Sequence, residues 1–368
     1  MSDLKSRVID LAVQIQQIPA PTFGESKRAE FIHKLFTQER KELKNICIDE
    51  TGNVLARLTG KGNGKPLIVS AHMDTVFPAD TDLRVKRQSE RVYGPGLGDN
   101  SLGVAALFGL LWSLRERNIP LSGDVWFVAN VCEEGLGDLR GMKAVVDRFG
   151  AGVRAYLVLE GLALGHVYHR AVGVKRYRVT ARTSGGHSWS DYGQPSAVHE
   201  LARLVVQLTS LDLPNHPRTT MNVGKIAGGT SVNVIASEAV LDLDLRSEGQ
   251  ESLMELVSAV EQLIQSVNAN RHGVTLEAEV IGQRPAGEIN SNHPLVKLAE
   301  ESLREQGLDT ALISGSTDAN VPLSMGYPAI VLGVTTGGGA HTKHEYINTA
   351  PIDQGMEQLV SFVGRAWK

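Results

Sequence analysis

Hydrophobic residues in the first half of the chain follow two different spacings. At residues 3–18 and 25–40, apolar side chains recur three and four positions apart, which predicts two amphipathic helices. Shorter segments are apolar throughout, as expected for strands buried on both faces. These segments are residues 67–71, 125–131 and 156–159. Since the apolar stretch 102–114 predicts a buried helix among them, the pattern indicates an α/β fold with a mostly parallel sheet and helices on both faces.

The pattern changes near residue 172. Apolar and polar residues alternate strictly at 177–181 and 239–246, so each of these predicted strands has one wet face. Two segments of helical spacing accompany them, which indicates an inserted α+β domain. The predicted domains are residues 1–171 with 287–368, which form the catalytic domain, and residues 172–286.

One glycine-rich segment resembles a phosphate-binding loop but lacks a residue that such a loop requires. Residues 60–66 place glycines and a lysine as a phosphate-binding loop does, but Pro66 stands where Ser or Thr is required. No helix is predicted to follow. We therefore predict a hairpin turn between two strands.

Composition narrows the class of protein. The chain has 42% hydrophobic and 21% charged residues, which is enough to bury a sizeable core. Its formal net charge is −4 without a basic stripe, so we expect no nucleic-acid partner. The longest apolar run, residues 103–112, is shorter than the about 20 residues that span a bilayer, so we expect no membrane partner. Two cysteines and no visible signal peptide favour the cytoplasm.

Polar residues stand where the predicted buried strands end. His72 and Asp74 follow the first strand, and residues two apart in an extended chain point to the same side. Asp99 follows a glycine-rich loop ahead of the apolar helix, where a plain helix cap is the alternative. Glu133 and Glu134 follow the second strand. The alternative interpretation is a pair of solvated surface carboxylates without a function. Ligands bind beyond the carboxyl ends of strands in open α/β sheets, so one crevice is expected here.

Two further candidates complete a set that is suited to metal binding. Glu160 ends the third strand, and three glycines precede His341. Two imidazoles and three carboxylates suit two Zn²⁺ ions, with Co²⁺ or Mn²⁺ as alternatives. The candidate ligands are His72, Asp99, Glu134, Glu160 and His341. Glu133 is the unassigned carboxylate beside a candidate ligand, so we predict that it is the general base.

In order and spacing, these segments resemble the co-catalytic di-zinc metallopeptidase family. That family includes peptidase T, glutamate carboxypeptidase, aminoacylase, acetylornithine deacetylase and succinyl-diaminopimelate desuccinylase. The resemblance covers essentially the whole chain. It implies that Asp74 orients His72, that Asp99 bridges the metals, and that Glu134 and Glu160 bind opposite metals. The family often holds the peptide bond after the bridging Asp in the cis form.

The last motif of the family decides between two histidines. It places the ligand His four residues before a Glu, which selects His341 over His344. His344 stands where the family commonly has Asp or Asn, so we interpret it as a residue at the rim or behind the ligands.

The inserted domain resembles the family's lid or dimerisation domain, which implies a homodimer. The segment Gly-Gly-His187-Ser matches the motif whose His polarises the substrate carbonyl, in some members from the partner subunit. Asn233 and Arg246 match substrate-contacting positions, and Arg246 could clamp a carboxylate. Gly315 and Ser316 match the loop near the terminal group of the substrate. From the residues alone, His187 could equally be a packed loop residue and Arg246 a solvated strand-end charge.

The resemblance implies hydrolysis of an amide bond in a small peptide or an N-acyl amino acid. Overall similarity favours a peptidase T-like aminopeptidase. Glu160 favours the alternatives, because N-acyl-amino-acid deacylases and glutamate carboxypeptidases tend to have Glu where aminopeptidases have Asp. A catalytically silent binding protein of the same fold is a remote alternative, which the intact Glu133 and ligand set disfavour.

Overall fold

The computed structural model describes residues 2–368, which divide into two compact units. The first unit comprises residues 2–171 and Glu288–Lys368. The second unit is Val172–Gly287, so the chain leaves the first unit once and returns to it.

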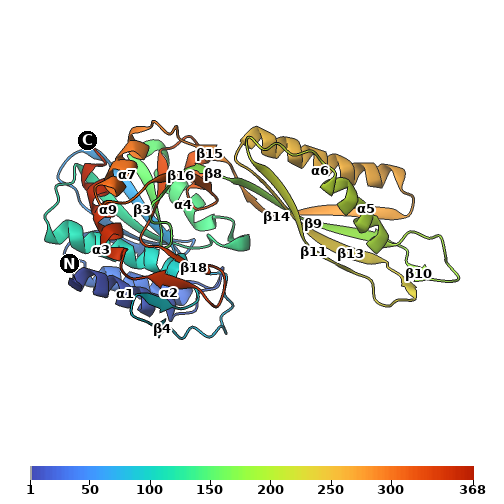
Figure 1. The fold of residues 1–368 in the computed structure, drawn as a ribbon, viewed down its shortest axis with the longest axis horizontal. Helices are drawn as coiled ribbons and strands as arrows, with labels where there is room; N and C mark the ends of the chain where they lie inside the picture. Colours follow the sequence, from blue (N-terminus) through green and yellow to red (C-terminus); the bar gives the residue numbers. More distant parts are fainter. Residues whose placement is uncertain (1) are drawn as a thin grey trace. The chain divides into compact units, whose positions relative to one another are not determined.

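A nine-stranded sheet forms the centre of the first unit (Figure 1). Its strands are β1 (Leu43–Ile48), β2 (Val54–Leu58), β3 (Gly64–His72), β6 (Gly123–Asn130), β7 (Ala155–Glu160), β8 (His166–Ala171), β15 (Gly287–Glu288), β16 (Ala311–Gly315) and β17 (Ala329–Gly333). The strand order is β1-β2-β6-β3-β7-β17-β8-β15, with β16 paired to β8. The central strands β6, β3, β7 and β17 are parallel, while β1 and β2 extend one edge in antiparallel fashion. The predicted mostly parallel α/β sheet is thus confirmed.

Helices flank this sheet and supply much of the core. They are α1 (Ser2–Gln16), α2 (Ser26–Gln38), α3 (Leu102–Glu116), α4 (Arg140–Phe149), α7 (Pro294–Arg304), α8 (Asn320–Ser324) and α9 (Ile352–Arg365). Single-turn helices are η1 (Leu97–Ser101), η2 (Gly135–Gly137) and η3 (Gly150–Gly152). Helix α3 packs against α1, α9 and the central strands β3 and β7. The stretch Leu97–Glu116 is apolar and long enough to cross a membrane, but 89% of its most apolar window is buried, so it is a core helix.

The loop between β2 and β3 is not the predicted hairpin turn. Strand β6 lies between β2 and β3, so the loop crosses the end of β6. Its glycines run close to the neighbouring backbone: a Cβ on Gly60 would lie 2.2 Å from the carbonyl oxygen of Gly123. The glycines therefore permit a close backbone crossing, which a pattern of turn residues does not distinguish from a hairpin.

A small antiparallel sheet aligns two loops that matter for the site. Its order is β18 (Gly337–Gly338), β19 (Tyr346–Asn348), β5 (Arg91–Tyr93) and β4 (Lys86–Arg87). Tyr346 lies opposite Tyr93. The segment just before β19 and the segment just after β5 therefore start from neighbouring points.

The second unit is an antiparallel sheet with two helices on one face (Figure 1). Its order is β11 (Thr219–Gly228), β13 (Glu238–Ser247), β9 (Gly173–Thr183) and β14 (Val274–Arg284). The helices are α5 (Ala197–Thr209) and α6 (Gln250–Asn270), and a two-stranded ribbon is formed by β10 (Gly186–His187) and β12 (Val234–Ile235). Inward residues such as Tyr177 and Leu243 pack under the helices. The other face carries ion pairs, among them Arg178 with Asp242 at 2.9 Å.

Candidate metal centre

His72 ends strand β3 and is almost completely buried. Its Nδ1 lies 3.1 Å from the main-chain oxygen of Asp74, which can only accept, so Nδ1 carries a hydrogen. Its Nε2 faces carboxylates, 3.1 Å from Asp99 Oδ1 and 3.8 Å from Glu160 Oε2. Burial alone would lower the pKa of His72, but hydrogen bonds to Asp74 and Asp99 and the nearby Glu160 raise it well above its usual value. The imidazole is thus held with Nε2 directed into an anionic pocket.

Asp74 accepts several hydrogen bonds that hold the segments carrying the candidate ligands. Its carboxylate accepts the backbone N–H groups of Glu133 and Glu134, both at 2.9 Å, and the hydroxyl of Thr22 at 2.9 Å. Its Oδ1 is 3.5 Å from His72 Nδ1. Burial would raise the pKa of Asp74, yet the bonds to His72 and to these backbone groups hold it below its usual value. Asp74 therefore contacts His72 chiefly through its main-chain oxygen, while its side chain fixes the turn that carries Glu133 and Glu134.

Asp99 lies between the two candidate histidines. Its Oδ1 is 3.1 Å from His72 Nε2, and its Oδ2 is 3.0 Å from His341 Nε2. Burial would raise the pKa of Asp99, but hydrogen bonds to His341 and His72 hold it well below the usual range. The peptide bond to Asn100 is cis. One carboxylate thus presents an oxygen to each imidazole.

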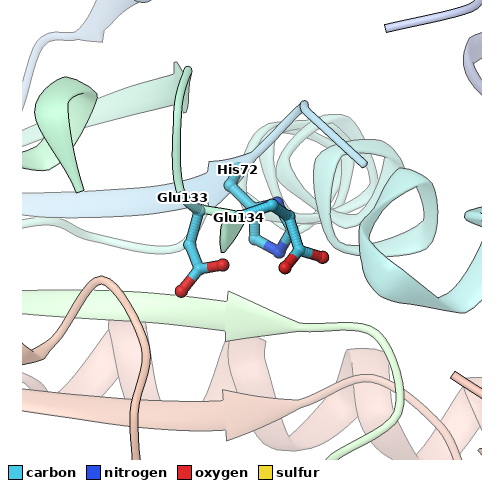
Figure 2. Close-up of side chains that lie close together, drawn as sticks. All are labelled: His72, Glu133 and Glu134. Atoms are coloured by element: carbon cyan, nitrogen blue, oxygen red, sulfur yellow. The ribbon is translucent and has the colours of Figure 1, made fainter. Parts of the chain in front are cut away.

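Glu133 and Glu134 follow β6 and extend in different directions from one turn (Figure 2). Both are buried, with 6% and 5% of their surface exposed. Glu134 Oε1 lies 3.3 Å from His341 Nε2 and accepts no hydrogen bond from the described residues. A buried carboxylate oxygen without a hydrogen-bond donor is costly unless a cation faces it.

His341 reaches the site from an exposed loop. Its side chain is 56% exposed, unlike that of His72. Asp99 and Glu134 raise the pKa of His341 to about 10. His344 is exposed and belongs to none of the clusters found among residues 2–368.

The candidate ligands form three overlapping clusters, and within each cluster the ligand atoms lie within 4.8 Å of one another. The clusters are His72 with Asp99 and Glu160, Asp99 with Glu134 and His341, and His72 with Glu133 and Glu134. Burial raises the pKa of Glu160 well above its usual value; His72 opposes this rise, and Asp99 adds to it. Crowded carboxylates repel one another, and imidazole nitrogens with carboxylate oxygens are the donors that Zn²⁺ accepts. The donor set and the unsatisfied Glu134 oxygen therefore fit two divalent cations that share Asp99.

A supporting layer on the N-terminal segment was missed by sequence reasoning. Arg28 is 1% exposed and donates to the main-chain oxygens of Met73 and Ile18, both at 2.6 Å. Glu25 accepts the N–H of Cys132 at 3.1 Å, directly before the acidic pair. Burial lowers the pKa of Arg28 to about 10. Because both residues lie at the start of an amphipathic helix, the spacing gave no signal that they are buried.

The candidate residues of the second unit lie in two places. His187 pairs with Val234 in the β10–β12 ribbon, and Asn233 accepts the N–H of Ser188 at 3.1 Å, so His187 and Asn233 are neighbours. Arg246 lies on the polar face of β13, and its Nε is 2.6 Å from Asp244 Oδ2. Asp244 also contacts Arg176 at 2.8 Å, so two guanidinium groups share one carboxylate.

Gly315 and Ser316 lie at the carboxyl end of β16 and are half-buried. Neither belongs to the ligand clusters in the described chain. The same loop continues to Asp318, which is completely buried, accepts the Asn130 amide at 2.7 Å and adds to the raised pKa of Glu160. The loop is thus connected to the site through Asp318, the last residue of the motif that begins at Gly315.

The chain is similar to known proteins along most of its length. A family model described as Peptidase family M20/M25/M40 matches residues 68–365. Carboxypeptidase G2 of Pseudomonas sp. (strain RS-16) is 25% identical over 346 residues, covering 89% of this chain and 80% of that protein.

Two solved structures have the same fold. The aminopeptidase PepT from Bacillus cereus ATCC 10987 is 22% identical, with a TM-score of 0.81 over 99% of both chains. A tripeptidase from Staphylococcus aureus subsp. aureus Mu50 is 23% identical, with a TM-score of 0.83 over 98% of both chains. These similarities identify the fold, whereas the substrate has to be argued from the residues of the site.

Proposed function

Because this chain belongs to peptidase family M20/M25/M40 and is a hydrolase, we propose that it is a two-metal aminopeptidase that acts on small peptides. The observation that carries the proposal is the position of Asp99, whose two oxygens lie 3.1 and 3.0 Å from two different imidazoles. A surface carboxylate or a helix cap does not need two histidines and two further glutamates around it. A carboxylate that is shared by two metal ions does need such ligands on both sides.

Two cations would be held by the residues of the overlapping clusters. His72 and Glu160 would bind one, Glu134 and His341 the other, and Asp99 both. We favour Zn²⁺, with Co²⁺ and Mn²⁺ as alternatives, because the donors are nitrogen and oxygen atoms only. When bound, such a pair polarises the scissile carbonyl and lowers the pKa of a water molecule.

Glu133 would perform the proton transfers. Its carboxylate accepts a proton from the attacking water and donates it to the leaving amine nitrogen. Its backbone N–H is held by Asp74, which also anchors Glu134, so base and candidate ligand keep a fixed separation. Glu133 itself is 6% exposed, so it has little contact with bulk water.

His187 would donate a hydrogen bond to the substrate carbonyl. Its Nδ1 accepts the backbone N–H groups of Trp189 at 3.2 Å and Ser190 at 3.4 Å. The ring hydrogen therefore sits on Nε2, so the neutral imidazole is preset as a donor. This tautomer supports the role that the resemblance implies, whether the residue acts within its own chain or in a partner.

We expect His187→Ala to lower kcat by about 10²- to 10³-fold, because one hydrogen bond to the developing oxyanion is lost. The metal content should be unchanged. Steady-state kinetics on a tripeptide substrate measure the effect, with His199→Ala as the control, since His199 is an exposed histidine on α5 of the same unit. A His187 variant with wild-type kcat would remove this residue from the mechanism.

Glu160 favours a second candidate function, an N-acyl-amino-acid deacylase or glutamate carboxypeptidase. The similarity to carboxypeptidase G2 supports the same alternative, whereas the PepT and tripeptidase structures support the first. Under the alternative, Arg246 would bind the substrate carboxylate, Asn233 would contact the substrate, and Gly315 and Ser316 would lie near its terminal group. The Arg246 side chain is 42% exposed, so it is accessible to a carboxylate from solvent.

One competition experiment separates these functions. Zinc-loaded protein is mixed with a free tripeptide, its N-acetylated counterpart and a peptide with C-terminal glutamate, and the products are identified by mass spectrometry against Glu133→Gln. Release of the first residue of the tripeptide supports the aminopeptidase. Release of acetate identifies a deacylase, and release of C-terminal glutamate a carboxypeptidase. If all three substrates stay intact, the proposal of a small-peptide hydrolase is wrong.

We also propose that the protein is a cytoplasmic homodimer joined through the second unit, without nucleic-acid or membrane partners. The edge strand β11, which is exposed at most positions, supports this interface. Light scattering of the purified chain tests the oligomeric state.

A further inference from the structure

Glu345 has a carboxylate that no step of the proposed mechanism uses. The residue is completely buried. Its Oε2 accepts the backbone N–H of Gly96 at 2.9 Å, and its Oε1 accepts those of Gly98 at 2.6 Å and Asp99 at 3.0 Å. Its main-chain oxygen accepts the N–H of Gly94 at 2.9 Å. One residue thus binds four backbone groups of the glycine-rich loop that ends at Asp99.

The same residue anchors the loop that carries His341. Residues 339–344 are exposed at every position, and Glu345 is the first buried residue after them. Its N–H donates to the main-chain oxygen of Thr342 at 3.2 Å, which closes the loop around His344. Only then does the chain enter β19, which pairs with β5. The position of His341 relative to Asp99 therefore depends on Glu345, whose carboxylate accepts the backbone N–H of Asp99.

The two side-chain oxygens of Glu345 accept three backbone N–H groups, so both oxygens are needed as acceptors. A glutamine of the same size would offer one oxygen and place an NH₂ group against backbone N–H groups. The glycine loop and the His341 loop would then lose their fixed spacing. Glu134 and His72 would not be affected in this way, because they are held from β6, β3 and Asp74.

We propose that Glu345 is a positioning residue that sets the separation of Asp99 and His341 and thereby the affinity of the cation held by Asp99, Glu134 and His341. The cation held by His72, Asp99 and Glu160 depends on it less. This inference rests on the proposed function, since it presupposes that the clusters bind two cations.

The test is a titration of metal-stripped protein with Zn²⁺ against a chromogenic chelator, which yields the two stepwise affinities. The chains compared are wild type, Glu345→Gln and the control Glu300→Gln. Glu300 is a buried carboxylate of the same unit that pairs with Lys297 and Arg304. In Glu345→Gln we expect one of the two steps to lose roughly 10- to 100-fold in affinity, as for other residues that orient metal ligands, and the other step to stay near wild type. The control should keep both affinities.

The outcomes separate this inference from the function on which it rests. If wild type fails to bind two equivalents, both are wrong. If wild type binds two and Glu345→Gln keeps both affinities, Glu345 has no positioning role. If both steps weaken together with the melting temperature, its role is general stability and the inference is overturned. Should Glu345→Gln not fold, Glu345→Asp keeps the charge but shortens the reach, and the same split must appear there, or the inference fails.

Discussion

Glu133→Gln lowers kcat by about 10²- to 10⁴-fold, the usual contribution of a general base. The carboxamide has the size of the carboxylate but cannot accept the proton of the attacking water. Asp74 binds the backbone N–H of this residue and not its side chain, so the turn and Glu134 keep their positions. The metal content, measured by elemental analysis, should therefore equal that of wild type while single-turnover hydrolysis collapses.

Glu39→Gln is the matched control for this variant. Glu39 is a half-buried carboxylate of the same unit whose bonds go to Trp112 and Arg115, away from the clusters. It should keep wild-type kcat. A Glu133→Gln protein that retained full turnover would assign the base to another residue, and one that lost its metals would make Glu133 a ligand.

Asp99→Ala has the second large effect, because Asp99 belongs both to the cluster with His72 and Glu160 and to the cluster with Glu134 and His341. Removing it leaves each cation with fewer ligands and leaves two imidazoles without their shared partner. We expect loss of at least one metal equivalent and a fall in kcat of about 10⁴-fold, since Lewis-acid catalysis supplies several kcal/mol. Metal content and kcat are measured on the same preparation.

The control for Asp99→Ala is Asp82→Ala. Asp82 is exposed and pairs with Arg84 two residues away, so its loss removes a carboxylate without touching the site. Its metal content and kcat should equal those of wild type. If Asp99→Ala kept two bound cations, Asp99 could not be the shared ligand, and the assignment of both clusters would have to be abandoned.

The position of the site could be predicted from local sequence because strand ends are local features. An apolar strand that ends in a polar residue places that residue at the sheet edge, and this holds for His72 and Glu160, while Glu134 follows the end of β6 by four residues. The parallel order of β6, β3 and β7 then brings the three together, as the alternation of strands and helices predicted. The hypothesis of a metal centre followed from the residue types, since imidazoles and carboxylates bind the same divalent metals.

Residues that support the site through tertiary hydrogen bonds gave no such signal. Arg28 lies on an amphipathic helix, where an arginine is normally solvated, yet it is buried against Met73 and Ile18. The role of Glu345 depends on the loop before Asp99, about 250 residues earlier in the chain, and no spacing rule connects segments so distant. The prediction of a hairpin turn at residues 60–66 was wrong for the same reason, because strand order is a long-range property.

Stepwise addition of Zn²⁺ to the metal-stripped protein, with hydrolysis of the peptide mixture followed at each step, tests the central claim most directly. If two cations at the Asp99 clusters drive amide hydrolysis, the stripped protein is inactive, and activity rises until the second equivalent is bound and then stays constant. Full turnover by the stripped protein, or a plateau reached with a single equivalent, would contradict a two-metal hydrolase.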